Sequence, residues 1–314
     1  MKKNQGSNIK EVKRQFKEVV ECFKRHGQLV KNPLLEPAEE ELPFDFEKRE
    51  DDEKFRKREC FNIEVPQDIE NPYIDLKGPL YKEKKHVFRF FLDGSLKSYY
   101  LGEYIIPSLS FPFMAGEIAA ACLFRNDNGT LVVPPSGFIR RICLLLPNQS
   151  LLPDNLRIEL EEKIKEFESV SGLKLELQHT EETESKDWRS SLRAKGISEM
   201  HNTEVQLAKQ VRENPAIGWL VIDGAIRKKM FLDLDNTIGL AKSFSRLPIF
   251  QIERRKSIDV IRLLTRLKEG HRTVVFKQTT GEEDAEATVK KNLGFWYLRL
   301  RSGSWLENPL QGVV

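Results

Sequence analysis

Cysteine is scarce in this 314-residue sequence, and the four that occur follow no recognisable pattern. No CxxC spacing is present, which argues against a zinc site or a disulfide framework. Three of the four lie in apolar or amphipathic stretches, so we expect small buried side chains in a reducing compartment. The four positions are Cys22, Cys60, Cys122 and Cys143.

Long hydrophobic runs are missing as well. The longest apolar run, near Ile142–Pro147, is only as long as a strand, whereas a membrane-spanning helix needs about eighteen residues or more. The lysines near the N-terminus are not followed by an apolar segment, so no secretory signal is expected. These absences predict a soluble, cytoplasmic protein without a membrane partner.

Charge of one sign is not in excess either. Lys and Arg number 51 against 48 Asp and Glu, which gives a net charge of +3. This is far from the basic balance of a dedicated nucleic-acid binder, so any DNA contact has to come from local patches and has to weaken steeply with salt. The sequence also contains no P-loop, GxSxG or GxGxxG motif, and we therefore do not expect this chain to hydrolyse ATP itself.

What the sequence does contain is a globular composition, 39% hydrophobic and 32% charged. Residues 1–80 differ from the rest. Ile9 to His26 has apolar residues at steps of three and four, which predicts an amphipathic helix. Pro33 to Lys57 is rich in charge and punctuated by proline, typical of an extended arm. We interpret residues 1–80 as an N-terminal helical and charged appendage for packing or assembly.

From residue 81 onward, strand patterns come first and helices then alternate with strands. HVFRFFLDGS predicts a buried strand that stops at Asp93-Gly94, and Asn126–Gly129 predicts a hairpin turn. This order indicates an α/β fold with a mixed sheet flanked by helices. The expected helices are 155–171, capped by Asp154 or Asn155, 188–213 and 257–269; the later expected strands are IGWLVIDG, TIGLAKSF, RTVVFK and LGFWYLRLR.

Two aspartates stand at the ends of the two clearest strand patterns. Asp93 and Asp223 each follow an apolar run and precede a glycine. A carboxylate in this position emerges at the rim of a sheet, and the glycine lets a metal ion or a phosphate approach. The alternative interpretation is that each Asp-Gly pair is simply a turn.

A third carboxylate, Glu204, falls on the apolar stripe of the 188–213 helix, in step with Met200 and Leu207. A buried carboxylate is costly unless a cation or strong donors meet it. One interpretation places Glu204 at the edge of the stripe, in solvent or paired with Lys209 or Arg212. The other is that it joins Asp93 and Asp223 in an all-oxygen site for Mg²⁺ or Mn²⁺.

The sequence resembles the NurA nuclease family. The resemblance rests on FLDGS at 91–95, PFMAGEIAAACLFR after it, the helix with Glu204, VIDGAI at 221–226, GLAKSF at 239–244 and FWYLRL at 295–300. It spans roughly residues 85–300 and implies an RNase H-like domain over 81–314, with an insertion around 145–190. The chain departs from the family pattern at Ala225, where members usually carry serine.

This resemblance implies a metal-dependent DNA nuclease. Asp93, Glu204 and Asp223 would ligate Mn²⁺ or Mg²⁺, and Lys242 would stand near the reaction as a fourth catalytic residue. The residues implied for DNA contact are Ser95, Lys97, Tyr297 and Arg299.

The activity implied is 5′→3′ exonucleolytic, with endonuclease activity as a further option, in DNA end processing, repair or phage defence. The implied partners are DNA, a HerA-type hexameric ATPase and a second copy of the chain in a homodimer.

Other interpretations stay open. Lys242 and Arg299 also fit solvated surface positions, and Tyr297 fits ordinary strand packing. The principal alternative function is a catalytically weakened RNase H-like subunit that binds DNA or supports assembly. In such a subunit one of the three carboxylates would be turned away or held in an ion pair. An RNase H-like enzyme acting on RNA is a third interpretation.

Overall fold

The computed structural model describes residues 9–30, 58–64, 71–76, 86–106, 109–181, 184, 187–212, 218–226, 229–231, 233–241, 248–253, 256–278, 293–300 and 312–314. It divides into two compact units. Unit 1 comprises residues 1–42, 93–122 and 133–211, and unit 2 comprises 43–92, 123–132 and 212–314. Both units contain residues from either side of residue 80, where the sequence suggested a boundary.

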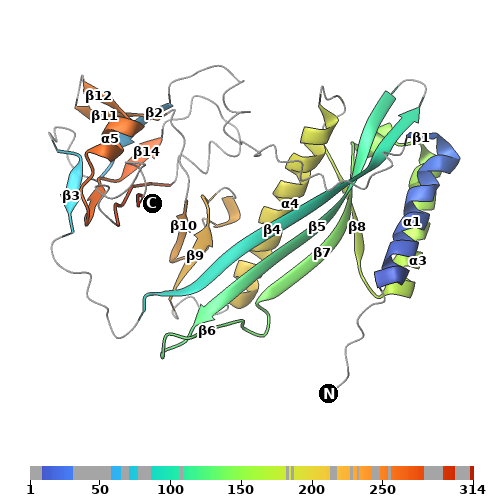
Figure 1. Cartoon of the computed structure of the whole chain (residues 1–314), viewed down its shortest axis with the longest axis horizontal. Coiled ribbons are helices and arrows are strands. Elements are labelled where there is room, and N and C mark those ends of the chain that lie inside the picture. Colours follow the sequence, from blue (N-terminus) through green and yellow to red (C-terminus); the bar gives the residue numbers. More distant parts are fainter. Residues whose placement is uncertain are drawn as a thin grey trace. The chain divides into compact units, whose positions relative to one another are not determined.

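Two long strands, β4 (Phe88–Ile106) and β5 (Leu109–Arg125), run through both units (Figure 1). The other elements of unit 1 are α1 (Ile9–His26), β1 (Gln28–Val30), β7 (Phe138–Leu146), η1 (Gln149–Leu151), α3 (Asp154–Ser171), β8 (Leu175–His179) and α4 (Trp188–Val211). Unit 2 adds β2 (Arg58–Asn62), β3 (Tyr73–Asp75), β6 (Leu131–Val132), β9 (Trp219–Asp223), η3 (Lys229–Phe231), β10 (Thr237–Leu240), β11 (Pro248–Glu253), β12 (Lys256–Asp259), α5 (Val260–Thr265), β13 (His271–Thr273) and β14 (Phe276–Gln278).

Strand pairing gives a mixed sheet in the order β10-β9-β4-β5-β7-β8, with β1 added to β4 and β6 to β5. In unit 1, β5 and β7 are antiparallel and β7 and β8 are parallel. In unit 2, β9 runs parallel to the first part of β4 and to β10. A second sheet of unit 2 has the order β12-β11-β2-β14, and β13 pairs with β3. The predicted α/β class with a mixed sheet flanked by helices is confirmed.

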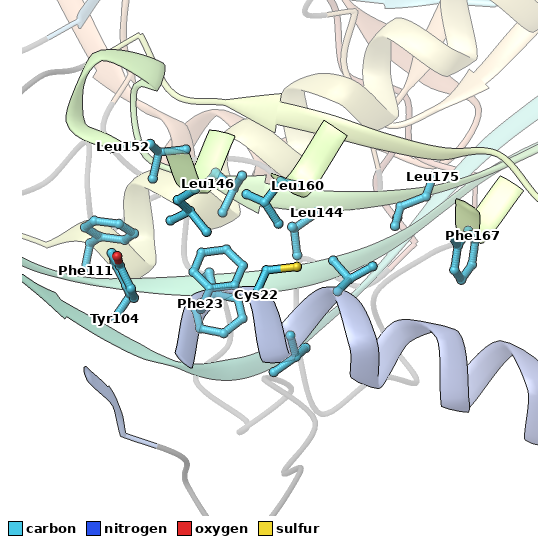
Figure 2. Close-up of a cluster of buried hydrophobic side chains, with 14 residues drawn as sticks. Cys22, Phe23, Tyr104, Phe111, Leu144, Leu146, Leu152, Leu160, Phe167 and Leu175 are labelled. Carbon is cyan, nitrogen blue, oxygen red and sulfur yellow. The ribbon is translucent and has the colours of Figure 1, made fainter. Parts of the chain in front are cut away.

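The core of unit 1 lies between the sheet and a layer formed by α1 and α3. Val19, Cys22 and Phe23 of α1 are buried against side chains of β5, β7 and α3. Figure 2 shows Cys22 and Phe23 among these side chains. The helix predicted at 9–26 is therefore confirmed, and its last turns form part of the core of unit 1.

The helices predicted at 155–171 and 188–213 are also confirmed, as α3 and α4. The predicted cap of α3 is wrong. Pro153 occupies the N-cap position, and no side chain caps it. Asn155 instead contacts His26 of α1, with 3.0 Å between Nδ2 and Nδ1. The helix ends at Gly172, as expected.

Three further expectations fail for identifiable reasons. The strand at 86–95 does not stop at Asp93-Gly94, because β4 continues to Ile106 beside β5. The helix expected at 257–269 is shortened to Val260–Thr265, because residues 256–259 pair with β11 and Asp259 caps the helix, accepting from the Arg262 N–H at 2.9 Å. The segment LGFWYLRLR forms isolated bridges only, within the part of the chain that is described.

None of the helices among the described residues combines the length and apolar character that crossing a membrane requires.

Candidate functional site

The two faces of β4 differ sharply around Asp93. Asp93, Ser95 and Lys97 are exposed. Gly94 and Leu96 point the other way, toward α4, since successive residues of a strand face opposite sides. The Leu96 side chain comes within 3.1 Å of the position a β-carbon would take on Gly196 of α4. Asp93 therefore projects from the face of β4 that α4 does not cover.

Glu204 of α4 lies against the backbone of β4 at Gly94. A β-carbon built on Gly94 would lie 2.5 Å from Glu204 Oε1 and 2.8 Å from its Cδ. Glu204 is only 3% exposed, which confirms that its stripe position is buried. Glycine is needed at 94 because a carboxylate occupies the space of a side chain. The turn expected at Asp93-Gly94 is absent.

The Glu204 carboxylate has a partner on its own helix. His201, one turn earlier, donates from Nδ1 to Glu204 Oε2 at 2.7 Å. Arg212, considered as an alternative partner, belongs to unit 2. Its guanidinium donates there to the Asp235 carbonyl at 2.5 Å and to Thr237 Oγ1 at 3.0 Å.

A partly buried ionic network fixes α4 on the sheet immediately before Glu204. The Arg141 guanidinium of β7 donates to Glu176 Oε2 of β8 at 3.0 Å, to Thr203 Oγ1 at 3.0 Å and to Glu199 Oε2 at 3.4 Å. Lys195 Nζ lies 3.1 Å from Glu199 Oε1. Burial disfavours ionised Glu176, but the hydrogen bond and charge of Arg141 outweigh burial and lower its pKa.

Asp223 ends β9 in unit 2, where it is exposed. Gly224 follows with φ of 102°, a conformation that favours glycine, so the second Asp-Gly pair does end a strand. In the β4–β9 ladder, Phe91 pairs with Val221 and Leu92 with Ile222. The residue after Leu92 is Asp93, and the residue after Ile222 is Asp223.

Tyr297 and Arg299 are buried in unit 2, at 7% and 2% exposure. Tyr297 packs edge-on against Phe250 with ring centroids 6.1 Å apart, and burial raises its pKa. The Arg299 guanidinium donates to the Leu264 carbonyl at 2.7 Å, and burial lowers its pKa. This burial argues against direct DNA contact by either side chain. The surface position considered for Arg299 is wrong.

Lys242 lies outside the described residues. Within the described part of the chain, no group of three or more His, Cys, Asp or Glu side chains is arranged to hold a metal ion. Asp93 projects from one face of β4 and Glu204 of α4 lies against the other face, so this geometry does not support them as ligands of one ion.

A site with fewer carboxylates than the three predicted still fits a hard cation. Mg²⁺ is usually held by one or two carboxylates, with water and substrate phosphates completing its octahedron. Asp93 of unit 1 and Asp223 of unit 2 are both exposed carboxylates. An exposed aspartate of this kind suits Mg²⁺ or Mn²⁺ bound together with a phosphate.

Sequence reasoning did not identify the contacts of three residues. The spacing of three between His201 and Glu204 lets the two side chains meet on one face of a helix, but it fits a helix-surface histidine as well. The close approach that glycine permits at position 94 is made by the Glu204 carboxylate. Arg141 gave no signal, because its partners come from β8 and α4, 35 and 58 residues away.

No family model matches this sequence, and a search of curated proteins finds no significant match.

Proposed function

We propose that this protein is a metal-dependent nuclease that hydrolyses DNA. We further propose that its reacting groups lie on the face of β4 that bears Asp93, Ser95 and Lys97. The observation that carries the proposal is the exposed carboxylate of Asp93, which shares one face of β4 with the exposed side chains of Ser95 and Lys97.

The strand order supports the RNase H-like fold that the sequence suggested. β4 has β5 on one side, and on the other side the parallel strand β9, which follows α4 in the chain. A mixed sheet in which the first long strand lies between a sequential neighbour and a later parallel strand is the arrangement expected of that fold.

Each residue on this face has a role in the proposal. Asp93 would hold the cation by its carboxylate oxygens, and Asp223 stays a ligand implied by the family resemblance alone. Ser95 can donate its hydroxyl proton to a phosphate oxygen, and Lys97 supplies a point charge to the DNA backbone. The bound ion would lower the pKa of a water and neutralise charge on the phosphate. The protein thus contributes position and charge and forms no covalent bond to DNA.

The polarity, the HerA-type ATPase, the homodimer and the repair or defence pathway stay predictions from the resemblance. Because the net charge is only +3, we expect weak DNA binding by the isolated protein. A partner that holds DNA would then be needed for processive cutting.

The test is cleavage of end-labelled linear DNA with Mn²⁺, Mg²⁺ or EDTA. Wild type is compared with Asp93→Asn and Asp223→Asn, which keep side-chain size and remove charge. Each substitution should reduce metal-dependent cutting by about 100-fold or more. Asp154→Asn, whose side chain is 83% exposed on α3, is the matched control and should cut normally. Cutting in EDTA, or unchanged cutting by both variants, would refute the proposal.

One observation favours the second candidate, a catalytically weakened subunit that binds DNA or supports assembly. Glu204 is paired with His201 and lies on the Gly94 side of β4, as expected when one carboxylate of the set is turned away. Absence of cutting with every ion, with and without a HerA-type partner, together with retained DNA binding, would select this candidate. Cutting confined to RNA or hybrid substrates would instead indicate an RNA-directed enzyme.

A further inference from the structure

We infer that Glu204 is a positioning residue: it holds the backbone of β4 beside Asp93 and does not ligate the metal ion. The inference rests on the proposed nuclease for its metal-binding and activity readouts. Its structural basis lies entirely within unit 1.

The first observation is the contact at Gly94. Oε1, Cδ and Cγ of Glu204 all lie within 3.0 Å of the place a β-carbon would take there. The side chain thus fills the space above Gly94 and restricts movement of the strand toward α4. Asp93 is the preceding residue, so fixing Gly94 also fixes the backbone from which the Asp93 carboxylate projects.

The second observation is that Glu204 is held in place by contacts of its own helix, α4. His201 donates to Oε2 at 2.7 Å, and the Arg141 network binds Glu199 and Thr203, the latter one residue before Glu204. These contacts fix the rotation of α4 about its axis. A carboxylate held in this way is pre-organised against the strand.

The third observation is the direction of Asp93. It leaves β4 on the exposed face, whereas Gly94 and Leu96 face α4. A ligand shared by Asp93 and Glu204 would have to reach around the backbone of β4. Packing support for Asp93 therefore explains the position of Glu204 better than metal ligation does.

A thermal double-mutant cycle tests the contact without any need for activity. Gly94→Ala should lower Tm by about 5 °C or more, because its methyl group meets the buried carboxylate. In the Gly94→Ala/Glu204→Ala protein the methyl group has room. The Tm of the double variant should therefore be clearly higher than the Tm expected if the losses of the two single variants were additive. Additive losses would show that the two residues do not touch and would overturn the inference.

Mn²⁺ titration calorimetry and cleavage kinetics test the role. Glu204→Gln keeps an oxygen that accepts from His201, so it should retain Mn²⁺ binding and cut within about threefold of wild type. Glu204→Ala should lower kcat and leave the Mn²⁺ concentration for half-maximal cutting unchanged. Loss of Mn²⁺ binding in Glu204→Gln as severe as in Asp93→Asn would make Glu204 a ligand and overturn the inference. If wild type neither binds Mn²⁺ nor cuts, the proposed function fails, and the thermal cycle alone decides whether Glu204 supports Gly94.

Discussion

Phe23 gives the sharpest test of how α1 belongs to the protein. The sequence suggested an appendage, whereas the structure places the end of this helix in the core of unit 1. Phe23 is fully buried, stacks on Phe113 with ring centroids 4.2 Å apart and meets Tyr104 edge-on at 5.5 Å. Phe23→Ala removes the ring and both aromatic contacts.

The expected loss of stability is large. Replacing a buried phenylalanine by alanine costs about 3–5 kcal/mol, and each aromatic pair contributes roughly 0.5–1.5 kcal/mol beyond its buried area. With two such pairs at Phe23, we expect a loss of about 4 kcal/mol. A typical domain has only about 5–15 kcal/mol in total, so the variant should be close to unfolding at 37 °C.

The assay is urea unfolding followed by circular dichroism. The matched control is Lys17→Ala, an exposed position on the same helix, which should change stability by no more than about 0.5 kcal/mol. If Phe23→Ala loses less than about 1 kcal/mol while the control behaves as expected, α1 does not pack in the core, and the docking inferred from Phe113 and Tyr104 is wrong.

Three further predictions concern the interior of unit 1. Arg141→Ala should cost about 3 kcal/mol in urea unfolding, since it takes the shared cation from the buried Glu199 and the partly buried Glu176. Arg140→Ala, which breaks only the more exposed pair with Glu117, should cost less than about 1 kcal/mol, and equal losses would contradict the network. The pKa of Glu176 is lowered in the folded state, so its stabilising contribution is present above the ordinary value of 4.5 and disappears as pH falls through the folded pKa. Glu176→Gln should therefore weaken the dependence of stability on pH on the acid side. An unchanged dependence there would refute the lowered pKa. Burial raises the pKa of Cys143 to about 12, so native protein at about pH 8 should react with a thiol reagent at this position only on unfolding, and rapid labelling would show that the thiol is accessible.

Local patterns were sufficient for much of the fold. The periodicity of residues 9–26, 155–171 and 188–213 predicted three helices, because a helix that buries one face repeats apolar residues every three to four positions. The same periodicity placed Glu204 on a buried stripe, as its low exposure confirms. Alternating and apolar runs located the strands, but the extent of β4 beyond Gly94 depended on pairing with β5, which no local pattern encodes.

The directions of the side chains on β4, by contrast, could be determined only from the tertiary structure. The sequence by itself determined that Asp93 and Asp223 each follow an apolar strand pattern and that Glu204 falls on the apolar stripe of its helix. Only the tertiary structure decided that Gly94, and not Asp93, faces α4, and that Arg141 joins Glu176 to Glu199. The physical reason is that neighbouring residues of a strand point to opposite faces: the sequence specifies the alternation, but packing against α4 selects which of the two faces is covered.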